Sequence, residues 1–182
     1  MDMTLKDIYP KFSTPFGMGD KGTHHSYLEV YEEVFHSRRQ GISLLELGVA
    51  GGHSLAMWAA YFKDSNIIGL DLLEGLMFPK VGFEFYKCDV TNSNQIASTL
   101  PINMTFDFII DDASHVPDHQ LKSFDILFPK LKDNGLYFIE DVSDLSYVSQ
   151  RLPKNAKIYD FRSKKNVKDD VLIIISKSTI EL

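Results

Sequence analysis

Two pairs of adjacent acidic residues occur in this sequence where they could form one reactive site. Asp111 and Asp112 directly follow a run of aromatic and β-branched residues, and Glu140 and Asp141 follow another. Such apolar runs are typical of buried parallel strands, whose carboxyl ends meet at the edge where α/β sheets bind ligands. Both acidic pairs are therefore expected at the same edge of a sheet.

The oxygen atoms of these pairs suit a metal ion. Asp112, Glu140 and Asp141 offer the carboxylate ligands that Mg²⁺ and other hard divalent ions take. Neighbouring strands lie about 4.8 Å apart, so acids at adjacent strand ends can share one ion. Two adjacent residues on a strand point to opposite faces, however, so one acid of each pair could instead contact a cofactor or cap a helix. The residues alone leave a metal site and solvated caps as equal alternatives.

His115 follows Asp112 by three residues and is the candidate general base, because histidine titrates near neutral pH. Pro117 then fixes the first turn of a helix that we expect to run to about Leu127. The sequence favours surface positions for four other histidines: His24, His25, His36 and His119. His24 and His25 would line the site only if the lead-in covers it.

A glycine-rich turn with an acid before it is typical of a ligand-binding loop. Glu46 lies near the end of an apolar run, Gly48 and Gly52 bracket the turn, and Ser54 opens the next expected helix. Glycine lets the backbone turn tightly and approach a ligand closely. The spacing is neither the G-x-G-x-x-G of dinucleotide-binding proteins nor the G-K-[ST] of phosphate loops, and a plain strand–helix turn would look similar.

Acids at the ends of the next two expected strands favour an adenosine ligand. The Asp71 carboxylate can accept both hydroxyls of a ribose, and Asp89 can meet the amino edge of an adenine. A pyrophosphate would be repelled by Glu46. An amino acid that carries an adenosine and a cation would instead find anionic partners in Glu46 and Asp111, and this combination describes S-adenosylmethionine.

Size and composition narrow the class of protein. With 182 residues, 44% of them hydrophobic, we expect a single domain over residues 1–182, in which 1–40 form a lead-in and a cap helix. The net charge of −6 and the lack of a long basic block argue against a nucleic-acid partner. One cysteine, no apolar signal segment and no membrane-spanning run predict a cytoplasmic protein without a membrane partner.

Hydrophobic periodicity predicts a doubly wound α/β fold. Strands alternate with helices along most of the chain, which is typical of a mostly parallel sheet. The last two strands are separated by a polar turn with no room for a helix, so they should form an antiparallel hairpin at one edge of a seven-stranded sheet. We expect strands at 42–47, 66–71, 83–89, 106–111, 136–139, 156–161 and 171–176, and helices at 26–38, 54–62, 92–100, 117–127 and 143–151.

Three stretches predict less regular structure. The lead-in over residues 1–23 is rich in proline and glycine and predicts an irregular path. Residues 72–79 are compatible with a short helix or a loop. The Asp-Asn-Gly at 133–135 predicts a turn. The helix that follows the lead-in should cap the sheet near its ligand edge.

Taken together, these motifs resemble class I S-adenosylmethionine-dependent methyltransferases, and more narrowly the macrocin/mycinamicin sugar O-methyltransferase family. The match covers most of residues 19–141, and the D-D-A-S-H with I-E-D combination is its specific part. The stretches that carry it are GDKG at 19–22, ELGV at 46–49, GGHSLAMW at 51–58, IGLD at 68–71, IIDDASH at 109–115 and GLYFIED at 135–141.

The resemblance implies a role for each candidate residue. It implies that Asp112, Glu140 and Asp141 bind Mg²⁺ and that His115 is the base. The residues that it implies for the cofactor pocket are Glu46, Gly48, Ser54, Asp71 and Asp89.

The chain departs from the family pattern in three places. Ala113 stands where glycine is usual, and residues 142–147 replace the usual T-S-Y. The chain also ends soon after the seventh expected strand, without the extra elements that shape larger acceptor pockets. The cofactor and metal assignments survive these departures, whereas the identity of the particular acceptor does not carry over.

The sequence therefore predicts an S-adenosylmethionine-dependent, divalent-metal-dependent O-methyltransferase that acts on a hydroxyl of a sugar or glycoside. A catechol-type enzyme, which would use the same ion on a phenolic diol, is the nearest alternative. A cofactor-binding scaffold without turnover and a dinucleotide-dependent sugar oxidoreductase are the others. Whether the chain forms a homo-oligomer stays open.

Overall fold

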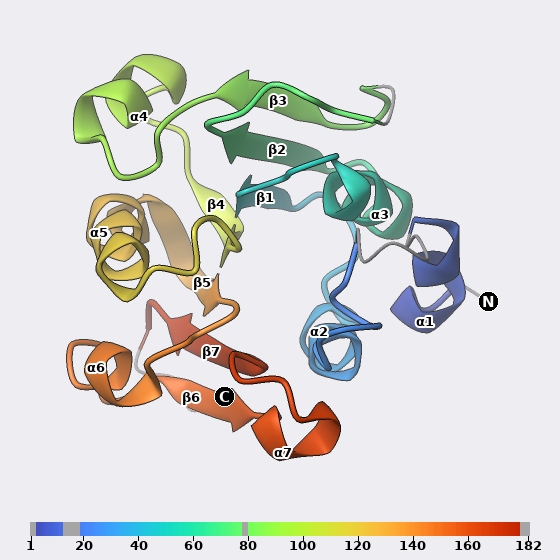
Figure 1. Cartoon of the computed structure of the whole chain (residues 1–182). Helices are drawn as coiled ribbons and strands as arrows, with labels where there is room; N and C mark the ends of the chain where they lie inside the picture. Colours follow the sequence, from blue (N-terminus) through green and yellow to red (C-terminus); the bar gives the residue numbers. More distant parts are fainter. Residues whose placement is uncertain (1–2, 13–18, 78–79, 179–182) are drawn as a thin grey trace.

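Seven strands form one sheet in the described part of this computed structural model (Figure 1). The described residues are 3–12, 19–77 and 80–178. The strand order is β3-β2-β1-β4-β5-β7-β6, with β1 to β5 parallel and β7 antiparallel to both β5 and β6. This confirms the predicted doubly wound, mostly parallel sheet with an antiparallel hairpin at one edge. The strands are β1 (Ser43–Leu47), β2 (Asn66–Asp71), β3 (Glu84–Lys87), β4 (Phe106–Asp111), β5 (Leu131–Ile139), β6 (Lys157–Asp160) and β7 (Val171–Ser176).

The order of the strands reverses between β1 and β4. From β1 the chain builds outward through β2 to β3, and it then returns to place β4 on the other side of β1. The loops that leave β1 and β4 diverge to opposite faces, and α/β proteins bind their ligands in the crevice that such a reversal creates. Glu46 lies near the end of β1 and Asp111 ends β4, so the predicted site lies at this reversal.

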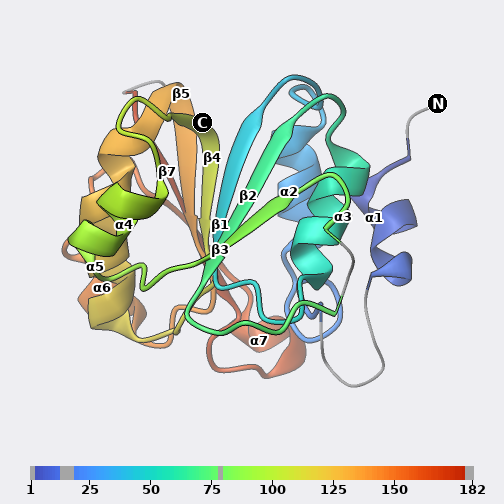
Figure 2. The same ribbon diagram turned by 90° about the horizontal axis from the view of Figure 1, so that it is seen from above.

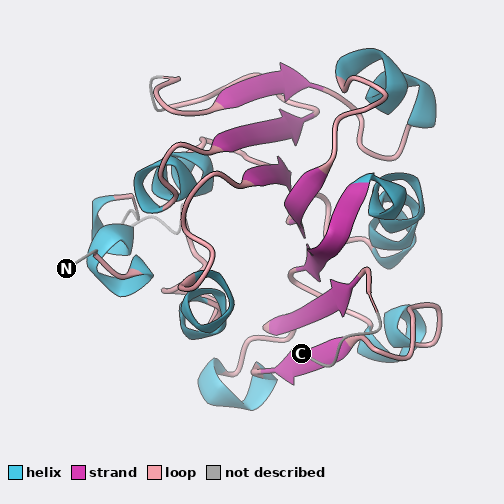
Figure 3. Cartoon of the chain, turned by 180° about the vertical axis from the view of Figure 1, so that it is seen from behind, coloured by secondary structure: helices cyan, strands magenta, loops and turns pink. Residues whose placement is uncertain are grey.

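Helices cover both faces of the sheet, as Figure 2 shows from above and Figure 3 from behind. None of the described helices is long and apolar enough to cross a membrane. One face carries α1 (Leu5–Ile8), η1 (Tyr9–Lys11), α2 (Leu28–Phe35) and α3 (His53–Tyr61). The other face carries α4 (Ser93–Thr99), α5 (Pro117–Leu127), η2 (Phe128–Lys130) and α6 (Leu145–Ser149), and α7 (Arg162–Lys165) lies beyond the end of β6.

Strand β1 shows how the sheet separates two apolar cores. Leu44 packs into the core on the α2 and α3 face, which contains Phe35 and Trp58, whereas Leu45 packs into the opposite core with Ile109. Both leucines are fully buried, as the alternation of side chains along a strand allows. Burying one leucine side chain contributes about 1.5–3 kcal/mol, so packing on both faces fixes where the strand ends lie.

The lead-in is more regular than its composition predicts, because α1 and η1 form within it. The side chain of Thr4 and that of Asp7 make a reciprocal capping box at the start of α1. Leu5 and Ile8 are buried in the core beneath this face. The part of the irregular lead-in predicted at 13–18 lies outside the described residues.

Two of the predicted turns are wrong. Residues 133–135 lie inside β5, which begins at Leu131 and shifts its register against β4 there, with Asn134 at φ +62°. The polar turn between the last two strands contains the short helix α7, which ends where Asn166 takes the left-handed conformation. In the ambiguous stretch, residues 72–77 form a loop and the next two lie outside the described residues.

The glycine turn after β1 packs directly against the turn after β4. Gly48 has φ +77°, and a Cβ built there would lie 2.1 Å from the Asp112 carbonyl oxygen and 2.4 Å from Ala113 Cα. The Asp112 amide donates a hydrogen bond to the Leu47 carbonyl at 2.9 Å. A side chain at position 48 would push these two turns apart, so the close contact at the ligand edge requires glycine.

Alanine substitutions test this contact. Gly48→Ala strains φ and also meets backbone atoms, so we expect the free energy of unfolding to fall by about 3 kcal/mol or more. Gly41→Ala separates the two effects, because Gly41 has φ +66° but nothing within 4 Å of its built Cβ; we expect a loss of about 1–2 kcal/mol. Urea unfolding followed by circular dichroism measures both, and Gly75→Ala, in open space, is the control. Equal losses at Gly48 and Gly41 would contradict the contact.

Candidate active site

Two adjoining cavities lie at the carboxyl edge of the sheet, over the crevice between β1 and β4. The smaller, of about 270 Å³, is lined by the turn after β1 and by residues 19–21 of the lead-in. The larger, of about 550 Å³, is lined by residues beyond the ends of β2 and β3. Gly48, Asp71 and Ala113 line both cavities and join them.

Asp71 ends β2 and fastens the glycine turn. Its Oδ2 accepts hydrogen bonds from the Val49 amide at 2.8 Å and the Ala50 amide at 3.0 Å, and its Oδ1 accepts one from the Leu73 amide at 2.9 Å. Each carboxylate oxygen has two lone pairs. The carboxylate can therefore hold the turn and still accept hydrogen bonds from a ligand at the junction of the cavities.

Glu46 is fully buried near the end of β1. Its Oε2 accepts a hydrogen bond from Ser54 Oγ at 2.8 Å, and its Oε1 lies 3.4 Å from Lys21 Nζ. Burial raises the pKa of the Glu46 carboxyl, and the Lys21 charge opposes this. Ser54 lines the smaller cavity, so Glu46 sets the direction of a hydroxyl that a ligand there can contact.

Asp89 lies beyond the end of β3 and lines the larger cavity. Its Oδ1 accepts hydrogen bonds from the Thr91 hydroxyl at 2.8 Å and the Thr91 amide at 2.9 Å, and these bonds lower the pKa of the Asp89 carboxyl. Because both bonds use Oδ1, a ligand in the cavity can approach Oδ2. Asp71 and Asp89 thus line the same cavity, and their contacts to a nucleoside stay a prediction.

Asp111 and Gly52 line neither cavity. The Asp111 carboxylate accepts hydrogen bonds from Ser123 Oγ on α5, from the Tyr137 hydroxyl at 3.3 Å and from the Ala113 amide at 3.3 Å. Burial raises the pKa of the Asp111 carboxyl to about 6. Asp111 therefore ties α5 to β5 on the other face of the sheet, while Gly52, at φ +82°, begins α3.

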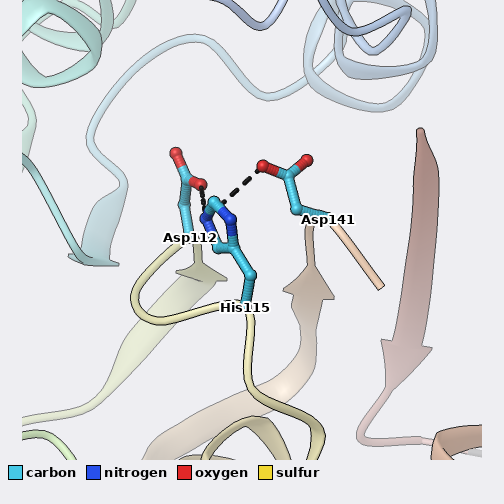
Figure 4. Close-up of side chains that lie close together, drawn as sticks. All are labelled: Asp112, His115 and Asp141. Carbon is cyan, nitrogen blue, oxygen red and sulfur yellow. Dashed lines mark hydrogen bonds and ion pairs between the residues drawn. The ribbon is translucent and has the colours of Figure 1, made fainter. Parts of the chain in front are cut away.

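Asp112, His115 and Asp141 point toward one another (Figure 4). His115 Nε2 lies 3.1 Å from Asp112 Oδ1 and 3.4 Å from Asp141 Oδ2. The hydrogen bond with Asp112 raises the pKa of His115 to about 9, although burial opposes it. Burial and the Asp112 charge raise the pKa of the Asp141 carboxyl to about 7. Without a bound cation, His115 therefore carries a proton at neutral pH.

The backbone at two of these residues is in an uncommon conformation. His115 has φ +55° and Asp141 has φ +53°. A left-handed conformation in residues other than glycine costs of order 1–3 kcal/mol, and such residues gather at functional sites. Hydrogen bonds hold both loops, because Ser143 Oγ donates to the His115 carbonyl at 3.3 Å and Gln120 Nε2 donates to the Glu140 carbonyl at 2.8 Å. A strained backbone at these two residues is consistent with the site that the sequence predicts, although Ala50, Asp64, Asn134 and Asn166 also have positive φ.

A buried lysine from the lead-in contacts the other acids. Lys21 is only 2% exposed, and its Nζ lies 2.6 Å from Asp112 Oδ2 and 2.8 and 2.9 Å from the two Glu140 oxygens. The Tyr31 hydroxyl also donates to Glu140. Burial alone would lower the pKa of Lys21, but three carboxylates, those of Asp112, Glu140 and Glu46, raise it well above its usual value. Burial also raises the pKa of Glu140, although Lys21 opposes this.

His25 is 3% exposed, so the predicted surface position is wrong, whereas His24 is exposed. His25 Nδ1 lies 3.3 Å from Asp141 Oδ1, and the ring stacks on Tyr27, whose hydroxyl donates to Asp141 at 2.7 Å. Burial lowers the pKa of His25. The lead-in does cover the site, which is the alternative that the sequence left open.

Sequence reasoning therefore left the place of His25 open and missed three residues that surround the acids: Lys21, Tyr27 and Tyr31. The available signals were weak, because a lysine beside a glycine is typical of an ordinary surface turn. The two tyrosines are four positions apart and share one side of the chain near α2, where the apolar pattern predicts core packing. Hydrophobic periodicity does not distinguish a buried hydroxyl that donates to a carboxylate from an apolar contact.

The three side chains that meet at His115 fit a divalent ion. Asp112, His115 and Asp141 each offer one ligand atom, and these atoms lie within 4.8 Å of one another. Two of them are carboxylate oxygens, which hard cations prefer. Glu140, the third ligand expected from sequence, is outside this group, and its oxygens accept bonds from Lys21 and Tyr31.

Comparison with known proteins places these observations in a family context. No family model matches the chain. The chain is 34% identical over 134 residues to the 8-demethyl-8-(2-methoxy-alpha-L-rhamnosyl)-tetracenomycin-C 3'-O-methyltransferase of Streptomyces olivaceus, in 66% of this chain and 33% of that protein. It is 30% identical over 146 residues to the mycinamicin VI 2''-O-methyltransferase of Micromonospora griseorubida, in 76% of this chain and 36% of that protein.

Among solved structures, the MycE methyltransferase from the mycinamycin biosynthetic pathway, in complex with Mg, SAH and mycinamycin VI, matches with a TM-score of 0.68. The two are 30% identical, over 77% of this chain and 39% of that one. The fold of this chain is thus similar to that of the MycE methyltransferase, as the resemblance to class I S-adenosylmethionine-dependent methyltransferases predicts. Within this class the chain is a relative of the sugar O-methyltransferases, as its motifs predict, and it spans about a third of the length of the curated relatives that it matches.

The geometry around His115 makes a prediction for the protein without added metal. The pKa of His115 should be about 9, and Asp112→Asn should bring it back toward the ordinary value of 6.5, because the hydrogen bond with Asp112 is its largest cause. Nitrogen-detected NMR of the imidazole over about pH 5 to 10 measures this pKa, because that range spans the ordinary and the raised values. The exposed His36 serves as internal reference. An unchanged His115 pKa in Asp112→Asn would contradict the assigned contact.

Proposed function

We propose that this chain is an S-adenosylmethionine-dependent O-methyltransferase that uses a divalent ion, such as Mg²⁺, to methylate a hydroxyl of a sugar or glycoside. The observation that carries the proposal is the position of His115. It lies between two carboxylates, and it lines a cavity that Ser54 and Asp71 also line. A base, a donor set for a cation and a ligand cavity are therefore adjacent.

The two cavities suggest how the cofactor is held. Asp71 and Asp89 offer carboxylate oxygens for the ribose hydroxyls and the adenine amino group in the larger cavity. Gly48 and Ser54 line the smaller cavity, where the amino-acid part would lie. Glu46 accepts a hydrogen bond from Ser54, and its negative charge would attract the amino group of the cofactor. This arrangement would bring the reactive methyl group of the cofactor close to His115.

Asp112 and Asp141 are the residues that we expect to hold the divalent ion. Their oxygens face the same space beside His115. A divalent ion bound there lowers the pKa of a hydroxyl group that it contacts. Glu140 accepts a hydrogen bond from Lys21, which also donates to Asp112 and so holds its carboxylate in place. If Glu140 is itself a metal ligand, as the sequence predicts, its carboxylate has to move away from Lys21.

His115 supplies the proton acceptor. In its neutral form, Nε2 can take the proton of the acceptor hydroxyl while the oxygen bonds to the methyl carbon and the electron pair of the broken carbon–sulfur bond stays on sulfur. Asp112 and Asp141 stabilise the resulting imidazolium. When a cation engages these two carboxylates, their hold on the proton weakens, so the pKa of His115 should fall and the neutral form become available. Binding both molecules in adjoining cavities would keep the reacting atoms close.

The sugar acceptor is supported by the relatives, whose names include a rhamnosyl tetracenomycin and mycinamicin VI. A catechol-type acceptor remains the second candidate, because the same base and donor set would serve a phenol. The two differ in how much they need the base, since an aliphatic hydroxyl is a far weaker acid than a phenol. A scaffold without turnover is disfavoured by the intact base between its two carboxylates.

Cofactor binding is the first test. S-adenosylhomocysteine should bind and NAD should not, because Glu46 disfavours a pyrophosphate beside the glycine turn. Asp71→Ala should weaken the binding roughly 10- to 100-fold, which corresponds to losing one or two hydrogen bonds to a charged group. Isothermal titration calorimetry measures this, with Asp125→Ala on the exposed side of α5 as the control. Unchanged affinity in Asp71→Ala would remove Asp71 from the cofactor site.

Turnover tests the base and the ion together. A chelator should abolish methylation of a glycoside acceptor and Mg²⁺ should restore it. His115→Ala should lower the rate by roughly 10²–10⁴, the usual contribution of a general base, with little change in cofactor affinity. A smaller loss that vanishes at raised pH would favour the phenolic acceptor. Full activity in excess chelator, or a wild-type rate in His115→Ala, would contradict the proposal.

A further inference from the structure

Lys21 reaches across the strand ends from a distant part of the chain. It lies in the lead-in, yet its Nζ contacts Glu46 near the end of β1, Asp112 after β4 and Glu140 after β5. The side chain of Lys21 is 2% exposed, that of Glu140 is also 2% exposed and that of Glu46 is fully buried. Three carboxylates from three neighbouring strands therefore converge on a single buried ammonium group.

We call the carboxylates of Glu46, Asp112, Glu140 and Asp141 the acidic centre. It has two ends, which meet at Asp112. At the lysine end, Glu46, Glu140 and Asp112 Oδ2 surround Lys21 Nζ. At the histidine end, Asp112 Oδ1 and Asp141 Oδ2 flank His115, whose side chain is 39% exposed. The lysine end is thus closed to solvent, and the histidine end is open to it.

The contacts of Lys21 are those of a cation in its binding site. An ammonium has three hydrogens to donate and no acceptor. Here Nζ donates to Asp112 at 2.6 Å and to Glu140 at 2.8 Å, and it forms an ion pair with Glu46 at 3.4 Å. Carboxylates placed so close together repel one another strongly where water is excluded. Without a positive charge between them they would separate, take up protons or bind another cation.

We propose that Lys21 is a positioning residue that acts as a built-in cation of the acidic centre. It fills the lysine end, so that a divalent ion can bind only at the histidine end. It also holds one oxygen of Asp112, which leaves the other aimed at His115. The ion at the histidine end rests on the proposed function, whereas the filled lysine end does not.

Counting bound Mn²⁺ by electron paramagnetic resonance tests this in the absence of cofactor. The wild type should bind one ion, and Asp141→Asn should bind it at least roughly tenfold more weakly, because one of two carboxylate ligands is lost. Lys21→Ala should bind an additional ion in the vacated lysine end. The double variant Lys21→Ala/Asp141→Asn should therefore still bind one ion tightly.

The double variant separates this proposal from the proposed function. If it binds no more Mn²⁺ than Asp141→Asn alone, the lysine end is not a cation position and the proposal is overturned. If it binds one ion while the wild type binds none, the role of Lys21 stands and the metal site of the proposed function fails. Because both are read from ion binding rather than turnover, loss of activity does not confuse them.

Folding provides a second readout that does not require Lys21→Ala to be stable. In EDTA, Lys21→Met should raise the equilibrium constant for unfolding by roughly 10²–10³, because buried carboxylates lose their counter-charge. In a Glu140→Gln background the same change should have at least a roughly tenfold smaller effect. Equal effects in the two backgrounds would overturn the proposal.

Chemical rescue of Lys21→Ala then distinguishes a cation position from general packing. Propylammonium has the atoms that this substitution removes, so it should raise the melting temperature of the variant and leave the wild type unchanged. Tetramethylammonium at the same concentration matches the ionic strength but cannot donate hydrogen bonds. Equal stabilisation by the two salts would mean a general salt effect and would count against the proposal.

Discussion

The close approach of four carboxylates at one edge of the sheet is the constraint on which the rest of the site depends. They come from the ends of three neighbouring strands, and most of them are buried: Glu46, Asp112, Glu140 and Asp141. Like charges so placed are costly unless each has a partner. Lys21 is the partner at one end of the centre and His115 at the other, and Asp112 forms a hydrogen bond with each of them. The same neutralisation that keeps the centre folded also leaves the partly exposed His115 side chain between the carboxylates of Asp112 and Asp141.

The fold supplies these partners through segments that are distant in sequence. Gly48 lets the turn after β1 lie against the turn after β4, which brings the cavities that Asp71 lines next to Asp112. The lead-in crosses the same edge and delivers Lys21, and α2 together with the residue before it delivers the hydroxyls of Tyr27 and Tyr31. The two cavities and the acidic centre are therefore adjacent, as the proposed transfer of a group between two bound molecules requires.

Much of the fold could be predicted from the sequence because its signals are local. The apolar run before Asp112, the proline that starts α5 and the acid that ends β2 each mark one element, and all three are where the pattern predicts them. What could not be predicted depends on contacts between distant segments. Lys21 looks like a turn residue until three strand ends meet around it. Residues 133–135 likewise have turn chemistry, but the buried Leu131 before them keeps the chain in β5.

The most direct test is the anomalous diffraction of Mn²⁺ in crystals grown with S-adenosylhomocysteine. One peak should lie between the carboxylates of Asp112 and Asp141, beside His115, and the Lys21 side chain should still contact Glu140 and Asp112. The cofactor product should occupy the cavities that Asp71 joins. A peak in the place of the Lys21 ammonium, with that side chain turned away, would contradict the account.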